Sequence, residues 1–174
     1  MNETLDRLDA GPRVIRTFSG KYINVFDPNP DDIIIEDIAH ALSNQCRFGG
    51  HIRRFYSVAQ HSIFCSDLAS PRLRLQALLH DASEAYLIDI PSPIKSELCN
   101  YKEIEHNLMV VISQKFGFDF PMDDEVKDID MYALEFEWNN LVIGDNPDVV
   151  TLSSWESKIN FLATFDQIMN SIKK

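Results

Sequence analysis

The sequence predicts a single, mainly α-helical domain that begins with a small β-hairpin, and three observations predict it. From residue 35 onward, apolar residues recur at the spacing of three and four that one face of a helix requires. Serine or proline precedes several of these stretches and glycine follows others, as at helix ends. The chain has 174 residues, 45% of them hydrophobic, which suffices for one packed core. We therefore expect one domain over residues 1–174, with residues 1–13 as a flexible N-terminal segment.

The hairpin is predicted over residues 14–26. There, Ser19-Gly20-Lys21 separates two short stretches that are rich in Val, Ile, Phe and Tyr. Residues 28–32 are expected to form a loop. A helix is then predicted over residues 35–46, where four apolar side chains share one face: Ile35, Ile38, Ala39 and Leu42.

Two serines predict the starts of the next helices. Ser57 and Gln60 form a capping-box pattern that opens a helix through residue 69 and places His61 in its first turn. Ser70-Pro71 opens another helix, which must end before Pro91. This second helix would carry three polar side chains on one surface: His80, Asp81 and Glu84.

The C-terminal half predicts three long helices. They are expected over residues 101–116, 125–143 and 154–172, and glycines at positions 117 and 144 end the first two.

Composition excludes several classes of protein. The net charge of −11 argues against a long nucleic acid as partner, and no stretch approaches the ~20 apolar residues of a membrane span. The N-terminus is polar and acidic, unlike a secretory signal. The three cysteines, Cys46, Cys65 and Cys99, form no Cys-x-x-Cys pair and are interpreted as structural thiols of a cytoplasmic protein.

Positive charge is concentrated between residues 47 and 75, whereas residues 119–148 are strongly acidic. A local positive region on an acidic chain suits a small anionic ligand better than a long polyanion. We expect Arg47, Arg53 and Arg54, together with Lys95, to supply this region. A solvated surface with accidental clustering is the alternative interpretation.

The strongest functional signal is His80-Asp81, followed by Glu84, within an otherwise apolar stretch. Burying such side chains is unfavourable unless something compensates for it, and a divalent metal would do so. Imidazole and carboxylate ligands suit Mn²⁺, Fe²⁺, Co²⁺, Ni²⁺ or Zn²⁺. A lone His-Asp pair is often only a pair on a helix surface, but the apolar context and Glu84 favour the metal.

His61 and Asp130 are the remaining candidate ligands. His61 lies among apolar residues near a helix start, where a satisfied core histidine is the alternative. Asp130 lies on an amphipathic helix, where an acid favoured by the helix dipole is the alternative. Asp128 is the rival ligand, but it follows Lys127 and is expected to be more exposed.

The order His61, His80-Asp81, Asp130 resembles that of the HD-domain metal-dependent phosphohydrolases. The stretches at residues 46–51, 57–62 and 89–95 resemble the small single-domain bacterial and phage branch of that family, and the similarity covers roughly residues 15–140. Members of the branch include deoxynucleoside 5′-monophosphatases and dATP triphosphohydrolases.

The resemblance implies an all-α HD-domain helical bundle. It implies one divalent metal ion (Mn, Co, Fe, Ni, Zn or Mg) held by four residues: His61, His80, Asp81 and Asp130. Glu84 and Asp89 would be the catalytic carboxylates beside the attacking water, although Asp89 without the resemblance is equally a helix-terminating turn residue.

Substrate contacts are also expected from residues 47–51, which precede His61, and from Lys95, which follows Asp89. Arg47 and Lys95 would contact phosphate, and His51 would join them. Phe48 and Gly50 would flank a base, although a plain core position is the preferred interpretation of Phe48.

The expected activity is that of a deoxynucleoside 5′-monophosphatase. The first alternative is a deoxynucleoside triphosphate triphosphohydrolase, and the second is a non-catalytic nucleotide-binding or sensor module, against which the intact Glu84 and Asp89 argue. A homo-oligomer interface involving Trp138 or Trp155 is conceivable, but both are interpreted as buried core residues.

Overall fold

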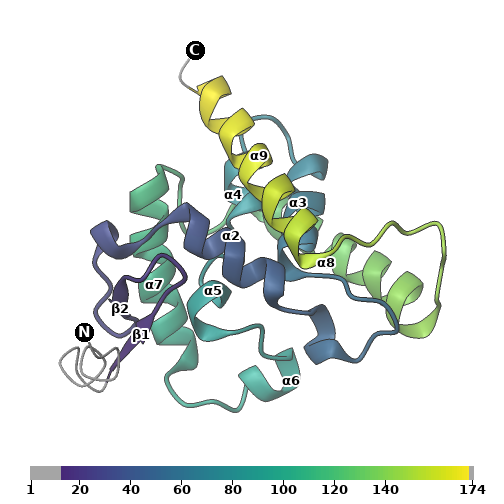
Figure 1. Ribbon diagram of the computed structural model, residues 1–174, viewed down its shortest axis with the longest axis horizontal. Coiled ribbons are helices and arrows are strands. Elements are labelled where there is room, and N and C mark those ends of the chain that lie inside the picture. Colours follow the sequence, from purple (N-terminus) through teal and green to yellow (C-terminus); the bar gives the residue numbers. More distant parts are fainter. Residues whose placement is uncertain (1–12, 173–174) are drawn as a thin grey trace.

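The computed structural model describes residues 13–172. It is mostly helical, at 60%, with one two-stranded antiparallel hairpin near the N-terminus. The proposed flexible segment, residues 1–13, lies outside the described residues except for Arg13. Figure 1 shows the helices gathered around α2, α3 and α4, with α7 on one side and α8 on the other.

The hairpin forms where the sequence predicts it. Strand β1 (Val14–Arg16) pairs with β2 (Tyr22–Asn24), and Ile15 lies opposite Ile23. Its turn is fixed to helix α2, because the backbone nitrogen and the hydroxyl of Ser19 donate to the two Asp37 carboxylate oxygens at 2.6 and 2.8 Å. Pro30–Asp32, in the expected loop, forms a single 3₁₀ turn.

The next two helices differ little from expectation. Helix α2 (Ile35–Asn44) ends two residues before the predicted boundary. Helix α3 (Val58–Leu68) begins after Ser57, whose hydroxyl accepts a hydrogen bond from the Gln60 backbone nitrogen at 3.1 Å. The serine half of the predicted capping box is therefore present, whereas the Gln60 side chain bonds the backbone of Val150 and Leu152 instead of Ser57. His61 occupies the first turn and is fully buried.

The single helix predicted from residue 70 to before Pro91 is wrong. Helix α4 (Arg74–Leu78) ends before His80, and α5 (Glu84–Leu87) begins after Asp81. Between them the chain makes tight turns with bonds between residues three apart. The physical reason is tertiary: the apolar spacing fits a continuous helix, but the turns bring Asp81 to 3.7 Å from His61 and His80 to 3.6 Å from Asp130, which are distant along the chain.

The remaining elements mostly follow the sequence. Helix α6 (Ser92–Lys95) is a short turn in the proline-containing loop. Helix α7 (Tyr101–Phe116) ends at Gly117, whose φ of 76° is the left-handed conformation that glycine adopts easily. Helix α8 (Asp124–Glu137) changes into a π-helical segment over Trp138–Ile143. Helix α9 (Ser154–Ile172) matches its predicted bounds.

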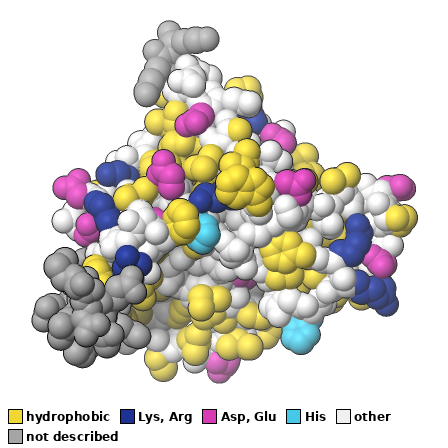
Figure 2. All heavy atoms as spheres, in the orientation of Figure 1, with side chains coloured by type: hydrophobic (Ala, Val, Ile, Leu, Met, Phe, Trp, Pro, Cys, Tyr) yellow, Lys and Arg dark blue, Asp and Glu magenta, His cyan; other side chains and the backbone are white. Residues whose placement is uncertain are grey.

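The core lies where α9 packs on α2, α3 and α4. Its largest fully buried side chains include Phe161, Leu42, Leu78, Ile38 and Leu108. The interpretation of the tryptophans as core residues is wrong, since Trp138 is 47% and Trp155 69% exposed. On the face in Figure 2, acidic and basic side chains are interspersed. Every helix within residues 13–172 is too short or too polar to cross a membrane.

Candidate metal centre and active site

The structure brings the four predicted metal ligands together. The Nε2 atoms of His61 and His80 lie 3.3 Å apart. From these two nitrogens, Oδ1 of Asp130 lies 3.1 and 3.6 Å away, and Oδ2 of Asp81 lies 3.7 and 3.3 Å away. Ligands about 2.1 Å from a tetrahedral metal lie about 3.4 Å from one another. These five distances, from 3.1 to 3.7 Å, are therefore close to the spacing of ligands around one ion.

The proton positions on both imidazoles follow from their outer neighbours. Nδ1 of His80 lies 2.7 Å from the Ala77 carbonyl oxygen, which can only accept, so this nitrogen carries a proton. Nδ1 of His61 lies 2.8 Å from a carboxylate oxygen of Glu137 and donates to it in the same way. In the neutral rings both Nε2 lone pairs then face the carboxylates of Asp81 and Asp130. Such a convergence of acceptors is stabilised by a cation, which is either a metal ion or the protons of the two imidazoles themselves.

The pKa values of these groups respond to the same geometry. Burial lowers the pKa of His80, but Asp81 and Asp130 more than offset this and raise it well above its ordinary value. Burial and Arg47 lower the pKa of His61, yet Glu137 and Asp130 raise it well above normal. Although burial opposes it, the two imidazoles lower the pKa of both aspartates. The raised imidazole pKa values and the lowered carboxyl pKa values all indicate that the cluster favours a proton or another cation between its side chains.

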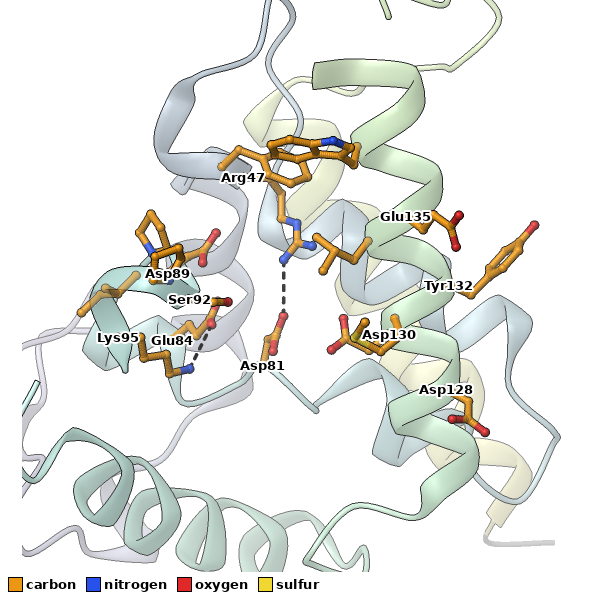
Figure 3. A pocket seen from close by; sticks show the side chains of 17 residues that line it. Arg47, Asp81, Glu84, Asp89, Ser92, Lys95, Asp128, Asp130, Tyr132 and Glu135 are labelled. Atoms are coloured by element: carbon orange, nitrogen blue, oxygen red, sulfur yellow. Dashed lines mark ion pairs between the residues drawn. The ribbon is translucent and has the colours of Figure 1, made fainter. Parts of the chain in front are cut away.

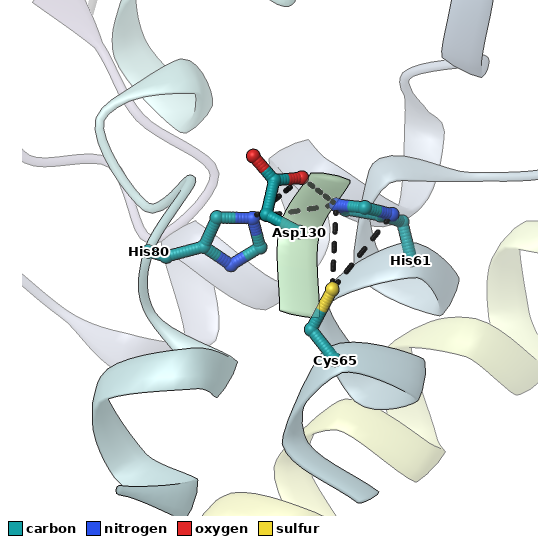
Figure 4. Close-up of side chains that lie close together, drawn as sticks. All are labelled: His61, Cys65, His80 and Asp130. Carbon is teal, nitrogen blue, oxygen red and sulfur yellow. Dashed lines mark hydrogen bonds and ion pairs between the residues drawn. The ribbon is translucent and has the colours of Figure 1, made fainter. Parts of the chain in front are cut away.

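Cys65 is a neighbour that the sequence analysis did not consider for the site. Together with His61, His80 and Asp130 it forms a cluster that could hold a metal ion. Its sulfur is 3.6 Å from Nε2 and 4.0 Å from Nδ1 of His61, so it lies beneath the ring rather than along a lone pair (Figure 4). We therefore assign Cys65 to packing against His61. The i, i+4 spacing of the two residues on α3 was the available signal.

Glu137 is the second residue that sequence reasoning missed. It is fully buried, and its second carboxylate oxygen accepts from Nε and Nη2 of Arg47 at 3.2 and 3.0 Å. The same guanidinium lies 3.8 Å from Asp81. Glu137 and Arg47 thus orient ligands on both sides of the centre. The usable signal was the spacing from Asp130, since seven residues are about two helical turns.

The ligand cluster opens into a pocket of about 870 Å³ (Figure 3). Besides Asp81 and Asp130, the pocket is lined by most of the other predicted site residues, which are Arg47, Phe48, Glu84, Asp89 and Lys95. Gly50 and His51, which were also expected to contact substrate, are not among its lining residues. In Figure 3, Asp130 points from α8 toward Asp81, whereas Asp128 points away from it.

Two carboxyl groups in the pocket have raised pKa values. Glu84 is buried, and among residues 13–172 its Oε2 atom has no hydrogen-bond partner. Burial and then Asp81 raise its pKa well above the ordinary value, although Lys95, 3.9 Å away, opposes this. Burial also raises the pKa of Asp89, with Arg47 opposing. Both groups can therefore carry a proton at a higher pH than an exposed carboxylate.

The charge of the pocket differs from the expected basic region. Six carboxylates line it, against only Arg47 and Lys95. Arg47 already pairs with Glu137, and Lys95 lies 2.5 Å from Glu105. Arg54 instead bonds Asp145 and the carbonyl oxygens of residues 146 and 149. Arg53 is exposed and does not line the pocket. The expectation that four basic residues form one positive region is therefore wrong.

One wall of the pocket is aromatic. Phe48 and Trp138 meet edge to face, with ring centroids 5.8 Å apart. Phe48 has the left-handed backbone angles φ 57° and ψ 30°, which are uncommon for a bulky residue. It is half-buried and lines the pocket, so its interpretation as a plain core residue is wrong.

Comparison with known proteins gives relatives but no activity. No protein-family model matches the chain. The uncharacterized protein YfdR of Escherichia coli (strain K12) is 47% identical over 131 residues, which cover 75% of this chain and 74% of that protein. An uncharacterized protein of Rhodobacter capsulatus is 40% identical over 112 residues, which cover 59% of this chain and 57% of that protein. The chain belongs to the same protein family as YfdR.

Proposed function

We propose that this protein is a metal-dependent phosphohydrolase of the HD-domain type that removes the 5′-phosphate from small deoxynucleotides. The observation that carries the proposal is the convergence of two imidazole nitrogens with Asp81 and Asp130, which line a pocket together with Glu84. The family resemblance of the motifs supports the same assignment.

The donor set fits a single divalent cation. His61, His80, Asp81 and Asp130 would hold it, and the hydrogen bonds to Glu137 and Ala77 keep both imidazoles in the tautomer that can bind. Two nitrogen and two oxygen donors suit Mn²⁺, Fe²⁺, Co²⁺, Ni²⁺ or Zn²⁺ better than Mg²⁺, which prefers oxygen. When bound, such an ion polarises a phosphoryl oxygen and lowers the pKa of a water molecule.

The chain's own residues would then handle protons. Glu84 is placed beside Asp81 on the pocket wall, and its carboxylate, once ionised, would accept a proton from the attacking water. Asp89 lies in the turn after α5, and its raised pKa suits a group that gives a proton to the departing alkoxide. Two carboxyl groups of different burial can thus divide the base and acid roles.

The pocket favours a small nucleotide with few charges. Its volume of about 870 Å³ lies within the usual range of about 300–1,000 Å³ for small-molecule sites. The aromatic wall of Phe48 and Trp138 offers a stacking surface for a base. Because six carboxylates line the pocket, each additional phosphate adds repulsion. This favours a monophosphate over the triphosphate substrate of the alternative activity.

A non-catalytic sensor is the competing class of function. A buried carboxylate without a hydrogen-bond partner, such as that of Glu84, is unfavourable for stability. A binding module gains nothing from such a group, whereas a proton-transfer site requires it. Glu84 therefore favours the enzyme.

The test is a turnover screen of the purified protein. All deoxynucleoside and ribonucleoside mono-, di- and triphosphates are incubated with Mn²⁺, Co²⁺, Zn²⁺ or Mg²⁺, and the products are identified. We expect inorganic phosphate and nucleoside from deoxynucleoside monophosphates, with ribonucleotides as poorer substrates. Release of triphosphate would establish the alternative activity, and nucleotide binding without turnover in any metal would establish the sensor.

Metal removal gives a prediction that does not depend on turnover. The folded-state pKa values of His61 and His80 are raised, so in metal-free protein their protonation stabilises the fold below their unfolded pKa of about 6.5. This stability is lost as pH rises through the folded pKa values. The lowered pKa values of Asp81 and Asp130 contribute throughout this range.

We therefore expect the melting temperature of the metal-free protein to fall between pH 6 and pH 9. A metal concentration about 1,000 times the dissociation constant at pH 6 should add about 4 kcal/mol, and the same concentration should add more at pH 9, where protons compete less. Thermal unfolding at the two pH values, with chelator and with Mn²⁺ or Zn²⁺, measures both effects. Greater stability of the metal-free protein at pH 9 would contradict the prediction.

A further inference from the structure

The turn between Glu84 and Asp89 has an unusual backbone. Ile88, the residue after α5, has a φ of 70°, which a β-branched side chain rarely adopts. Such a conformation persists only where surrounding contacts impose it. This turn also separates the two candidate catalytic carboxylates, so the contacts that impose it decide where those groups lie.

The side chain of Gln45 makes two of these contacts. Its Nε2 atom donates to the Glu84 carbonyl oxygen at 2.9 Å, and its Oε1 atom accepts from the Asp89 backbone nitrogen at 2.9 Å. One amide group thus bonds both ends of the turn. The Tyr101 hydroxyl adds a third contact, a bond of 3.3 Å to the carbonyl oxygen of Ile88.

Gln45 is itself fixed to the part of the chain that carries the metal ligands. It follows the last residue of α2, and its carbonyl oxygen accepts from the backbone nitrogen of Val58, the first residue of α3. His61 lies one turn further along α3. The Gln45 side chain therefore joins the helix of a metal ligand to the turn of the two carboxylates.

Neither carboxylate is held firmly by its own side chain. Oε2 of Glu84 has no hydrogen-bond partner among the described residues, and its Oε1 lies 3.9 Å from the Lys95 nitrogen. Within residues 13–172, the Asp89 carboxylate makes no hydrogen bond or ion pair, and only its backbone is bonded. The backbone contacts of the turn must therefore set the positions of both groups.

We propose that Gln45 is a positioning residue, which holds Glu84 and Asp89 at their working distance from the metal ligands. This rests on the proposed phosphohydrolase function. Gln45 does not line the pocket and acts only through the turn. Displacement of a reacting group by about 1 Å can reduce a rate by about 10²-fold, so loss of the two bonds affects the rate constant more than the binding of substrate.

The chain offers a matched control in Gln60. Its side-chain amide also bonds both ends of a short segment, donating to the Val150 carbonyl oxygen at 2.7 Å and accepting from the Leu152 nitrogen at 2.9 Å. That segment does not line the large pocket. Methionine has nearly the size of glutamine but cannot form these bonds, so Gln45→Met and Gln60→Met remove the same interaction at two places.

We expect Gln45→Met to lower kcat by about 10- to 100-fold, to change KM by less than about threefold and to leave the metal content unchanged. Gln60→Met should keep kcat within about twofold. In the Glu84→Gln background, Gln45→Met should lower kcat by a smaller factor than in the wild type, because part of its effect acts through Glu84 and only the part through Asp89 remains. Hydrogen exchange of the Asp89 amide should become faster in Gln45→Met alone.

Three results would overturn the proposal while the wild type remains active: an unchanged kcat in Gln45→Met, an effect that adds fully to that of Glu84→Gln, or an equal loss in Gln60→Met. Unchanged hydrogen exchange of the Asp89 amide in Gln45→Met would show that the bond from this amide to Gln45 does not hold the turn. A wild type that turns over no nucleotide rejects the proposed function and this role with it, so the two failures are distinguished by the wild-type assay.

Discussion

The Asp130→Ala protein is expected to lose its divalent metal and to hydrolyse its nucleotide at least about 100-fold more slowly than the wild type. Asp130 supplies a donor atom 3.1 Å from Nε2 of His61 and 3.6 Å from Nε2 of His80. A bound metal contributes several kcal/mol to phosphoryl transfer, and each 1.36 kcal/mol is a factor of ten in rate. Metal content by elemental analysis and the rate at saturating substrate measure the two effects.

Asp128→Ala is the matched control. Asp128 lies two residues earlier on the same helix, is exposed and points away from Asp81 (Figure 3). Its loss removes the same charge from the pocket mouth without removing a donor, so metal content should stay at the wild-type level. A metal-loaded, active Asp130→Ala protein, or a metal-free Asp128→Ala protein, would show that the ligand set is wrong.

The Glu84→Gln protein is expected to keep its metal and lose about 10²–10⁴-fold in kcat. Glutamine preserves the size of the side chain but cannot take a proton, and general acid–base help has about that magnitude. Because Glu84 is buried without a partner for Oε2, removal of its charge should leave the melting temperature unchanged or raise it. A rate loss together with a stability gain is characteristic of a group retained for chemistry.

Glu135→Gln provides the comparison for this prediction. Glu135 also lines the pocket, but it lies on α8, on the wall opposite Glu84 (Figure 3). Its change to glutamine alters the pocket charge equally and should change kcat by less than about threefold. Loss of metal from Glu84→Gln would instead make Glu84 a ligand, and full activity would remove it from the mechanism.

Local signals in the sequence were sufficient for most helices. The capping serine of α3, the glycine after α7 and the apolar spacing of α9 each act over a few residues, and the structure has these elements close to their predicted bounds. The break between α4 and α5 has no such signal. Its apolar pattern fits a helix, and the tight turns arise because His80 and Asp81 lie near residues that are distant in the chain.

The residues of the site also divide into those that a local signal identifies and those that depend on partners distant in the chain. The four proposed ligands carry side chains whose chemistry is visible in the sequence, and the structure places them together. Glu137 and Gln45 act through partners that are far along the chain: Glu137 is 76 residues from His61 and 90 from Arg47, and Gln45 is 39 residues from Glu84. An acid on an amphipathic helix or an amide at a helix end is ordinary until those partners are known.

The charge of the pocket has a consequence for the order in which a metal ion and a nucleotide would bind. The pocket has six carboxylates against two cationic side chains that already have partners, and this excess of acidic groups disfavours a phosphate group when no metal is bound. For the proposed function we therefore expect the metal to bind first and the nucleotide affinity to rise with metal occupancy, which titration calorimetry at increasing metal concentration would measure. In a cell, the supply of the metal, rather than that of the nucleotide, would then decide how many copies of the protein are able to work.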